Sequence, residues 1–248
     1  MECSEQDLVQ AAGWMVNAKH LVAFTGAGIS VESGIPPFRG KGGIWSKYDP
    51  SILDIDYFWS KPLESWKGIT EIFYTHFLDA RPNAAHYLLS RLEREGILKS
   101  VITQNIDNLH QEAGSRLVIE YHGNSQWLRC SLCGARYSLS EVSLESLPPR
   151  CSEDQEILKP DFVFFGEGIP PDAASRSVQE VSDADLLLII GTTGEVMPAG
   201  MLPSIAKSHG ARVIEINPEY SAFTASLTDL FLQGPAAEVC RQLEPYLF

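Results

Sequence analysis

The sequence predicts an α/β fold, a doubly wound parallel sheet with a smaller second domain inserted into it. Three observations support this fold class. Short apolar runs of strand length recur along the chain, segments with helical periodicity separate most of them, and the runs end in small or polar residues. Alternating strands and helices are typical of a parallel sheet covered on both faces, and ligands bind such sheets beyond the carboxyl ends of the strands.

The predicted strands are the buried apolar runs. The first run reads Leu-Val-Ala-Phe-Thr and a later one reads Leu-Leu-Leu-Ile-Ile, as expected of strands that are covered on both faces. In chain order, the predicted strands are residues 21–25, 101–104, 118–121, 186–190, 212–216 and 230–232. Helical periodicity predicts helices at about 5–18, 83–95, 171–182, 198–208 and 235–246.

Two stretches interrupt this alternation and predict the smaller domain. Residues 31–80 combine Gly, Pro and aromatic residues with a later helical region, whereas residues 125–160 hold clustered cysteines and weak strand signals. We therefore expect a Rossmann-like domain made of residues 1–30, 81–124 and 161–248. The small domain would join a ligand-binding loop and helical module at 31–80 to a zinc-ribbon-like module at 125–160.

Composition and charge exclude several classes of protein. The formal net charge of −13 argues against direct nucleic-acid binding, because phosphate affinity needs clustered Lys and Arg. No apolar run approaches the roughly 18 residues of a membrane-spanning helix, and the N-terminal residues lack the features of a signal peptide, so we expect a cytoplasmic protein without membrane contact. The acidic surface would attract lysine-rich protein segments or serve solubility alone, and net charge by itself favours solubility.

A glycine-rich turn, Gly26-Ala27-Gly28-Ile29-Ser30, follows the first predicted strand. Such a turn lets the backbone approach a pyrophosphate, whose charge is met by N–H groups at a helix N-terminus. Val31 stands where a dinucleotide fingerprint normally has Gly or Ala, and no acidic residue ends a second strand about 20 residues later. The turn predicts a dinucleotide site unlike that of a plain dehydrogenase. The segment after it, with Phe38 and Arg39, is either a loop that closes over a ligand or a structural loop.

Several motifs occur in one order from residue 21 to about residue 239. They are Gly26-Ala27-Gly28-Ile29-Ser30, Gly34-Ile35-Pro36-Pro37-Phe38-Arg39-Gly40, Thr103-Gln104-Asn105-Ile106-Asp107-Asn108-Leu109-His110, Tyr121-His122-Gly123, Lys159-Pro160-Asp161-Phe162-Val163-Phe164-Phe165-Gly166-Glu167, Gly191-Thr192-Thr193 and Ile216-Asn217-Pro218. As an ordered set they resemble the signature of the sirtuins, a family of NAD-dependent protein deacylases.

The resemblance implies that NAD binds as a cosubstrate at the strand ends. It implies that Gln104 and Asn105 contact the nicotinamide ribose, and that Ile106 and Asp107 hold the carboxamide. The implied NAD-binding residues are Gly26, Ala27, Gly28, Ser30, Phe38, Arg39, Gln104, Asn105, Ile106, Asp107, Gly191, Thr192, Thr193, Asn217 and Ala236.

His122 and Asn105 are the expected catalytic residues. An imidazole titrates near neutral pH and suits general-base catalysis. The resemblance implies that the acyl oxygen captures the ribosyl C1′ while His122 draws a proton through the ribose hydroxyls, giving nicotinamide, free lysine and O-acetyl-ADP-ribose. We expect an NAD-dependent deacylase of acyl-lysine proteins or peptides. The alternatives are a mono-ADP-ribosyltransferase or NAD hydrolase, and a module that senses NAD without turnover.

The resemblance also places the acyl-lysine substrate. The implied substrate-binding residues are Val163, Phe164, Phe165, Gly166, Glu167, Gly194 and Glu195. Sirtuins that remove succinyl or malonyl groups carry a Tyr-x-x-Arg pair, whose Arg matches the acyl carboxylate. Here Ile69 and Ile72 occupy those positions, and no arginine occurs between Arg39 and Arg81. A neutral acyl group is therefore favoured, with acetyl as the first expectation.

Three of the five cysteines cluster with one acidic residue. Cys130, Cys133 and Cys151 are followed by Asp154, which stands where the family usually has a fourth cysteine. A carboxylate oxygen also ligates zinc, although structural sites more often use thiolate. Three outcomes follow: a zinc site of three Cys and one Asp, three Cys completed by another ligand, or a site that has lost its metal. A bound zinc would be structural.

Overall fold

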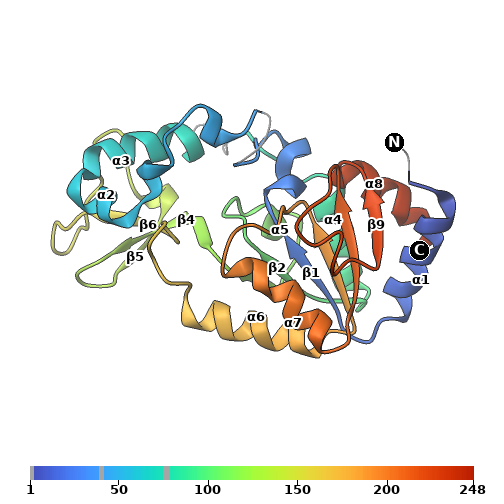
Figure 1. Cartoon of the computed structure of the whole chain (residues 1–248). Coiled ribbons are helices and arrows are strands. Elements are labelled where there is room, and N and C mark those ends of the chain that lie inside the picture. Colours follow the sequence, from blue (N-terminus) through green and yellow to red (C-terminus); the bar gives the residue numbers. More distant parts are fainter. Residues whose placement is uncertain (1–2, 39–41, 75–78) are drawn as a thin grey trace.

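The computed structural model describes residues 3–38, 42–74 and 79–248, which form two lobes (Figure 1). The larger lobe contains a six-stranded sheet in the order β3-β2-β1-β7-β8-β9, and every neighbouring pair is parallel. Its strands are β1 (Leu21–Thr25), β2 (Leu98–Thr103), β3 (Val118–Glu120), β7 (Leu186–Ile190), β8 (Arg212–Asn217) and β9 (Leu230–Gln233). The predicted doubly wound sheet and its six predicted strands are confirmed.

Helices cover both faces of this sheet. One core contains residues of α1 (Glu5–Asn17), α4 (Ala84–Arg94) and α8 (Ala236–Leu243), and the other contains residues of α6 (Pro171–Asp183) and α7 (Leu202–Ser208). Strand β1 divides its side chains between them, because successive residues of a strand point to opposite faces. Leu21 and Ala23 belong to the first core, and Val22 and Phe24 belong to the second. All five predicted helices are present, although a 3₁₀ turn at Ala199–Met201 precedes α7.

The smaller lobe contains an antiparallel sheet in the order β5-β4-β6. Its elements are β4 (Gly123–Cys130), β5 (Arg136–Ser138), β6 (Leu158–Phe162), α2 (Ile55–Ser60) and α3 (Pro62–Ile69), which leads into a π-helical turn at Thr70–Tyr74. Trp66 joins the helices to this sheet, because its Nε1 donates to the Leu158 carbonyl at 3.0 Å within one shared core. The weak strand signals of the cysteine-rich stretch correspond to this sheet, while the exact domain bounds stay a prediction.

The strand order reverses between β1 and β7. From β1 the chain proceeds outward to β2 and β3, and later returns to place β7 on the other side of β1. Ligands of open α/β sheets bind at the carboxyl ends of the strands where the order reverses. The short helix α5 (Leu109–Glu112) follows β2 at this edge. Within the described residues, no helix has both the length and the apolarity to cross a membrane.

Candidate active site

The glycine-rich turn after β1 packs directly on the carboxyl end of β7. Gly26 N–H donates to the Ile190 carbonyl at 3.0 Å, and Gly28 N–H donates to the Gly191 carbonyl at 2.8 Å. A Cβ on Gly28 would lie 2.6 Å from the Gly191 Cα, and a Cβ on Gly26 would lie 2.7 Å from the Thr192 Cβ. Only glycine fits this approach, which brings the predicted residues Gly26, Gly28 and Gly191 together.

The polar residues after β2 converge on the same turn. Asn105 Nδ2 donates to the Gly26 carbonyl at 3.1 Å and to Ser30 Oγ at 3.3 Å. Ser30 Oγ donates to Asp107 Oδ2 at 2.7 Å, and Asp107 Oδ1 accepts from the Leu109 N–H at 3.0 Å. Burial raises the pKa of the Asp107 carboxyl above its ordinary value, and these two hydrogen bonds oppose the rise. Ser30, Asn105 and Asp107 therefore form one buried, ordered cluster.

A hydroxyl and imidazole network supports this cluster from inside the larger lobe. Thr25 Oγ1 donates to Thr103 Oγ1 at 2.9 Å, and Thr103 Oγ1 also accepts from the Asn105 N–H at 3.1 Å. Since the Thr25 hydroxyl proton is used, His110 Nε2, 3.0 Å away, donates to Thr25 Oγ1. Burial lowers the pKa of His110 well below its ordinary value, and the neighbouring His86 lowers it further. No role for His110 is predicted from the sequence alone.

His122 lies beside the residues that follow β2. Its Nδ1 is 3.0 Å from the Gln104 carbonyl oxygen. A carbonyl only accepts, so Nδ1 carries the proton and the neutral ring keeps its lone pair on Nε2. Burial lowers the pKa of His122, and the hydrogen bond to Gln104 opposes that shift. The neutral form, which is the form that acts as a base, is thus favoured at pH 7.

Gln104 links His122 to the ends of β7 and β8. Gln104 Nε2 donates to Thr192 Oγ1 at 3.1 Å, and Asn217 Nδ2 donates to the Thr192 carbonyl at 3.1 Å. Ala236 is buried at the start of α8, next to Ala237, whose N–H donates to Glu32 Oε2 at 2.5 Å. The predicted residues Gln104, Thr192, Asn217 and Ala236 therefore border the same edge of the sheet as the glycine-rich turn.

Aromatic residues form the side of the smaller lobe that joins this region. The ring centroids of Phe38 and Trp45 are 5.5 Å apart, and those of Trp45 and Phe165 are 6.2 Å apart. Ile106 is buried in the core of the smaller lobe, so the chain that follows β2 packs on both lobes. The prediction for Arg39 lies outside the described residues.

The segment from Val163 to Glu167 already uses much of its own backbone. The N–H groups of Val163, Phe164 and Phe165 donate to the His122 carbonyl, to Glu167 Oε2 and to the Leu53 carbonyl, at 2.9, 2.8 and 2.8 Å. Lys159 Nζ lies 2.9 Å from the same Glu167 oxygen, so Glu167 closes a small network behind the segment. An added substrate strand would have to use other backbone groups here.

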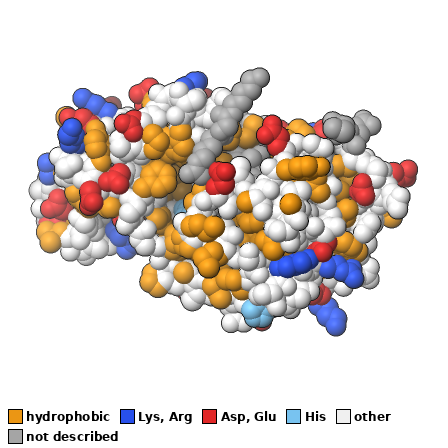
Figure 2. Space-filling view, viewed as in Figure 1, with side chains coloured by type: hydrophobic (Ala, Val, Ile, Leu, Met, Phe, Trp, Pro, Cys, Tyr) orange, Lys and Arg blue, Asp and Glu red, His pale blue; other side chains and the backbone are white. Residues whose placement is uncertain are grey.

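A second loop, residues 193–197, faces solvent next to the end of β7. Gly194 has φ +79° and is buried, while Thr193 and Glu195 are exposed and their side chains meet at 3.5 Å. The neighbouring Met197 is 65% exposed and Met201 is 56% exposed. Figure 2 shows hydrophobic side chains gathered over α6 and α7 on this face of the molecule.

The three clustered cysteines and Asp154 come together in the smaller lobe. Their ligand atoms all lie within 4.8 Å of one another, with Cys133 Sγ 3.7 Å from Cys151 Sγ and Cys130 Sγ 3.3 Å from Asp154 Oδ2. Tetrahedral zinc with Zn–S bonds of about 2.3 Å needs sulfur–sulfur separations of about 3.8 Å. The donor set and spacing therefore fit a structural zinc ion, and Tyr137 OH, 3.1 Å from Cys151 Sγ, supports one ligand from outside.

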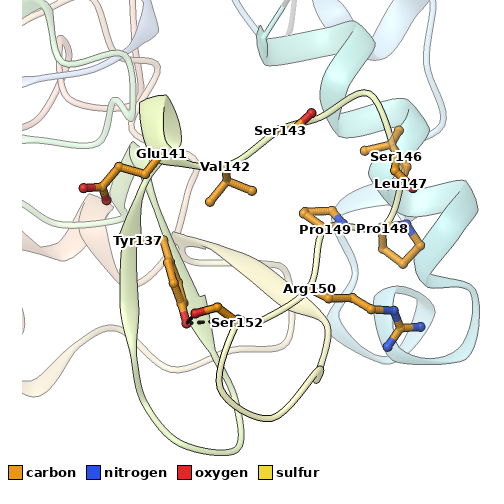
Figure 3. Close-up of a pocket in the computed structure, with 10 residues that line it drawn as sticks. All are labelled: Tyr137, Glu141, Val142, Ser143, Ser146, Leu147, Pro148, Pro149, Arg150 and Ser152. Atoms are coloured by element: carbon orange, nitrogen blue, oxygen red, sulfur yellow. Dashed lines mark hydrogen bonds between the residues drawn. The ribbon is translucent and has the colours of Figure 1, made fainter.

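A separate cavity of about 490 Å³ lies next to this cysteine cluster (Figure 3). Loop residues line it, including Val142, Pro149, Arg150 and Ser152, and Tyr137 points toward Ser152 across its base. None of its lining residues belongs to the cluster of Ser30, Asn105, Asp107 and His122. The cavity is thus a feature of the zinc-ribbon-like module and not of the polar site.

Comparisons with known proteins identify relatives over nearly the whole chain. The model of the Sir2 family matches residues 26–198. A relative named NAD-dependent protein deacylase 2, from Pyrobaculum aerophilum, is 45% identical over 239 residues, which cover 95% of this chain and 94% of that protein.

Solved structures show the same fold with ligands bound. A Sir2 variant with a deacetylated p53 peptide and 3′-O-acetyl-ADP-ribose superposes with a TM-score of 0.91 at 35% identity, covering 99% of this chain and 98% of that chain. A complex of a Sir2 homologue with NAD superposes with a TM-score of 0.90 at 39% identity, covering 100% of this chain and 96% of that chain.

Proposed function

We infer the function from one premise: the chain belongs to the Sir2 family. It is an NAD-dependent protein deacylase, with NAD as cosubstrate and acyl-lysine proteins or peptides as substrates. The products of removing an acetyl group would be nicotinamide, free lysine and O-acetyl-ADP-ribose. The family relationship and the polar cluster at the sheet edge support this activity independently.

The observation that carries the assignment of roles is the hydrogen bond between His122 Nδ1 and the Gln104 carbonyl. It fixes the tautomer, so Nε2 keeps the lone pair that a general base needs. It also ties the imidazole to the same stretch of backbone as Asn105 and Asp107. A base on the far side of the sheet would have no access to a ribose bound between these residues.

The remaining residues position the nucleotide. Bound NAD supplies a ribosyl C1′ whose nicotinamide leaves. Asp107, fixed by Ser30 and the Leu109 N–H, and Ile106 would hold the carboxamide. Asn105, fixed by Gly26 and Ser30, would hold the ribose, and the glycine-rich turn would meet the phosphates with backbone N–H groups. Such pre-ordered groups lower the barrier through orientation and electrostatic stabilisation.

A neutral acyl group is the substrate class that the smaller lobe supports. Ile69 and Ile72 are 0% exposed and belong to its apolar core. The stretch between Arg39 and Arg81 contains no arginine that would meet an acyl carboxylate. Burying a carboxylate without a partner costs on the order of several kcal/mol. Succinyl and malonyl groups are therefore disfavoured relative to acetyl or longer apolar chains.

Cys130, Cys133, Cys151 and Asp154 would hold one structural zinc ion. Four protein ligands would leave no open coordination position, so the ion would stabilise the antiparallel sheet and take no part in deacylation. The cytoplasmic location and the absence of direct nucleic-acid binding stay predictions, which cell fractionation and a binding assay with labelled duplex DNA would test.

The decisive experiment incubates the protein with NAD and a panel of acetyl-, butyryl- and succinyl-lysine peptides, and identifies the products by mass spectrometry. Deacylation predicts O-acyl-ADP-ribose and free lysine peptide, most readily with a neutral acyl group. ADP-ribose attached to the peptide would favour a mono-ADP-ribosyltransferase. Free ADP-ribose formed equally with and without peptide would favour an NAD hydrolase, and either result would overturn the proposal.

A further inference from the structure

Glu215 is a charged residue between the buried apolar residues Val213, Ile214 and Ile216 of strand β8. It is 0% exposed, although carboxylates are rarely buried completely unless they are paired. Its Oε1 accepts from Asn217 Nδ2 at 2.8 Å and from Ser221 Oγ at 2.5 Å, and its Oε2 accepts from Thr228 Oγ1 at 2.6 Å. Thr224 Oγ1 lies 3.1 Å and 3.0 Å from the two oxygens. All of these donors are neutral groups.

Three of the four donors belong to the loop that connects β8 to β9. Ser221, Thr224 and Thr228 thus converge on one carboxylate, which gathers the loop into a compact turn. Hydrogen bonds to a charged acceptor are about twice as strong as those between neutral groups. Deacylation itself requires no charge at this position, so the contacts of the loop determine what the carboxylate does.

The loop contacts the turn that follows β7. The Ala222 N–H donates to the Thr193 carbonyl at 3.0 Å. The Phe223 ring lies directly against Gly194, since a Cβ built on Gly194 would lie 2.6 Å from the Phe223 Cζ. Gly194 has φ +79°, a conformation that the Phe223 contact and the Ala222 hydrogen bond hold in place. The turn is the segment proposed to meet the substrate peptide.

A second connection leads from the same carboxylate to the nucleotide side. Asn217 Nδ2 donates both to Glu215 Oε1 at 2.8 Å and to the Thr192 carbonyl at 3.1 Å. Thr192 Oγ1 in turn accepts from Gln104 Nε2 at 3.1 Å. One buried carboxylate therefore fixes the amide of Asn217, the turn that holds Thr192, and the loop that supports Gly194.

We propose that Glu215 is a positioning residue that holds the NAD-binding part and the peptide-binding part of the site in their correct relative positions. The inference rests on the proposed deacylase function and adds a residue that touches neither ligand. Through Asn217 it orients the nucleotide end, and through Phe223 it orients the turn for the acyl-peptide. Loss of the carboxylate therefore weakens the binding of both substrates.

The test compares steady-state constants of three variants with the unmodified protein. Glu215→Gln keeps the shape and one acceptor but removes the charge, and the hydroxyls of the loop can rotate to accept from its amide. We expect KM for NAD and KM for acetyl-peptide each to rise about tenfold, while kcat changes less than about twofold. A rise of this size is typical when a group that orients a substrate is displaced. Phe223→Leu should raise KM for the peptide only. Thr228→Val, which removes one hydroxyl, should raise both constants by a smaller factor.

The matched control is Glu180→Gln. Glu180 is a partly buried carboxylate whose Oε2 also accepts from a hydroxyl, Ser100 Oγ at 2.7 Å, and lies 3.0 Å from His20 Nε2. It lies on α6 near the middle of β2 and not at the ligand edge. It should leave both KM values unchanged. If Glu215 had a purely structural role, Glu215→Gln would lower kcat and leave both KM values unchanged. That outcome would overturn the proposal. If Glu215→Gln does not fold, unchanged KM values in Thr228→Val would overturn it.

Failure of the proposed function would appear differently. In that case the unmodified protein would release no nicotinamide when acetyl-peptide is added. Calorimetric titration with ADP-ribose then measures the nucleotide half alone. A Kd for ADP-ribose that rises about tenfold in Glu215→Gln and stays constant in Glu180→Gln supports the positioning role. Equal Kd values in all three proteins would contradict it.

Discussion

Replacement of Gly28 by alanine tests whether the close approach of β1 and β7 builds the nucleotide site. The added Cβ would lie 2.6 Å from the Gly191 Cα and 2.9 Å from the Gly191 carbonyl carbon. Carbon atoms prefer separations of about 3.5–4.0 Å, so the two backbones have to part by about 1 Å. The Gly28 N–H to Gly191 carbonyl hydrogen bond, now 2.8 Å, resists this movement.

The cost follows from these contacts. Overpacking costs about 1–3 kcal/mol, and losing a backbone hydrogen bond adds about 1 kcal/mol. We therefore expect a loss of about 3 kcal/mol in the free energy of unfolding. For a chain of this size that corresponds to a fall of about 10 °C in Tm. Because the turn carries the N–H groups that would meet the phosphates, KM for NAD should rise as well.

Urea unfolding and the initial rate of nicotinamide release measure the two effects. Gly13→Ala is the matched control, because Gly13 lies inside α1 and an added Cβ would meet no atom within 4 Å beyond its chain neighbours and the backbone of its own helix. There, alanine should stabilise the protein by roughly 0.5–1 kcal/mol and leave KM for NAD unchanged. If Gly28→Ala keeps both the stability and the KM of the unmodified protein, the close approach of β1 and β7 does not build the nucleotide site.

Three further predictions concern metal and pH. Elemental analysis should find one zinc per chain in the unmodified protein and in Asp154→Cys but not in Asp154→Ala, whose Tm should fall; equal zinc contents in all three would contradict the assigned ligand set. Burial lowers the pKa of His86 to about 4, so the stability present above pH 6.5 should decrease by about 3 kcal/mol as the pH falls to about 4, because only the unfolded chain binds the proton in that range. Urea unfolding of His86→Gln should show a smaller decrease over this range, because His110 and His122, whose pKa values burial also lowers, still contribute to it; an identical slope in both proteins would argue against the role of His86. Burial also lowers the pKa of His122, so kcat/KM should rise with pH to a plateau through a midpoint below 6.5; a midpoint above 6.5 would exclude this environment for the base.

The parts of the fold that the sequence predicts are those with an unambiguous local pattern. The fully buried strands β1 and β7 read as continuous apolar runs, and β8 nearly so. The small sheet gave weaker signals, because β4 mixes polar residues with Trp127 and Leu128 and is held by cross-strand pairing with β5 and β6. Such pairing depends on residues far apart in the chain, so no local pattern displays it.

The candidate site was likewise only partly predictable from the sequence. Residue types at strand ends pointed to Asn105, Asp107 and His122, but not to their partners. Ser30 meets Asp107 across 77 positions of sequence, which requires the β1 and β2 pairing. His110 was missed because the turn that directs it inward depends on Asn108 in a left-handed conformation, φ +67°. The role of Glu215 was not predicted either, although a buried charged residue between apolar strand residues requires a partner.

The most direct test of the account is nicotinamide release from NAD, measured with and without acetyl-lysine peptide, in the unmodified protein and in His122→Ala. We predict rapid release that depends on the peptide, and a loss of peptide turnover in His122→Ala, with folding that circular dichroism shows to be unchanged. Equal peptide turnover by the two proteins would show that the imidazole held by Gln104 is not the base.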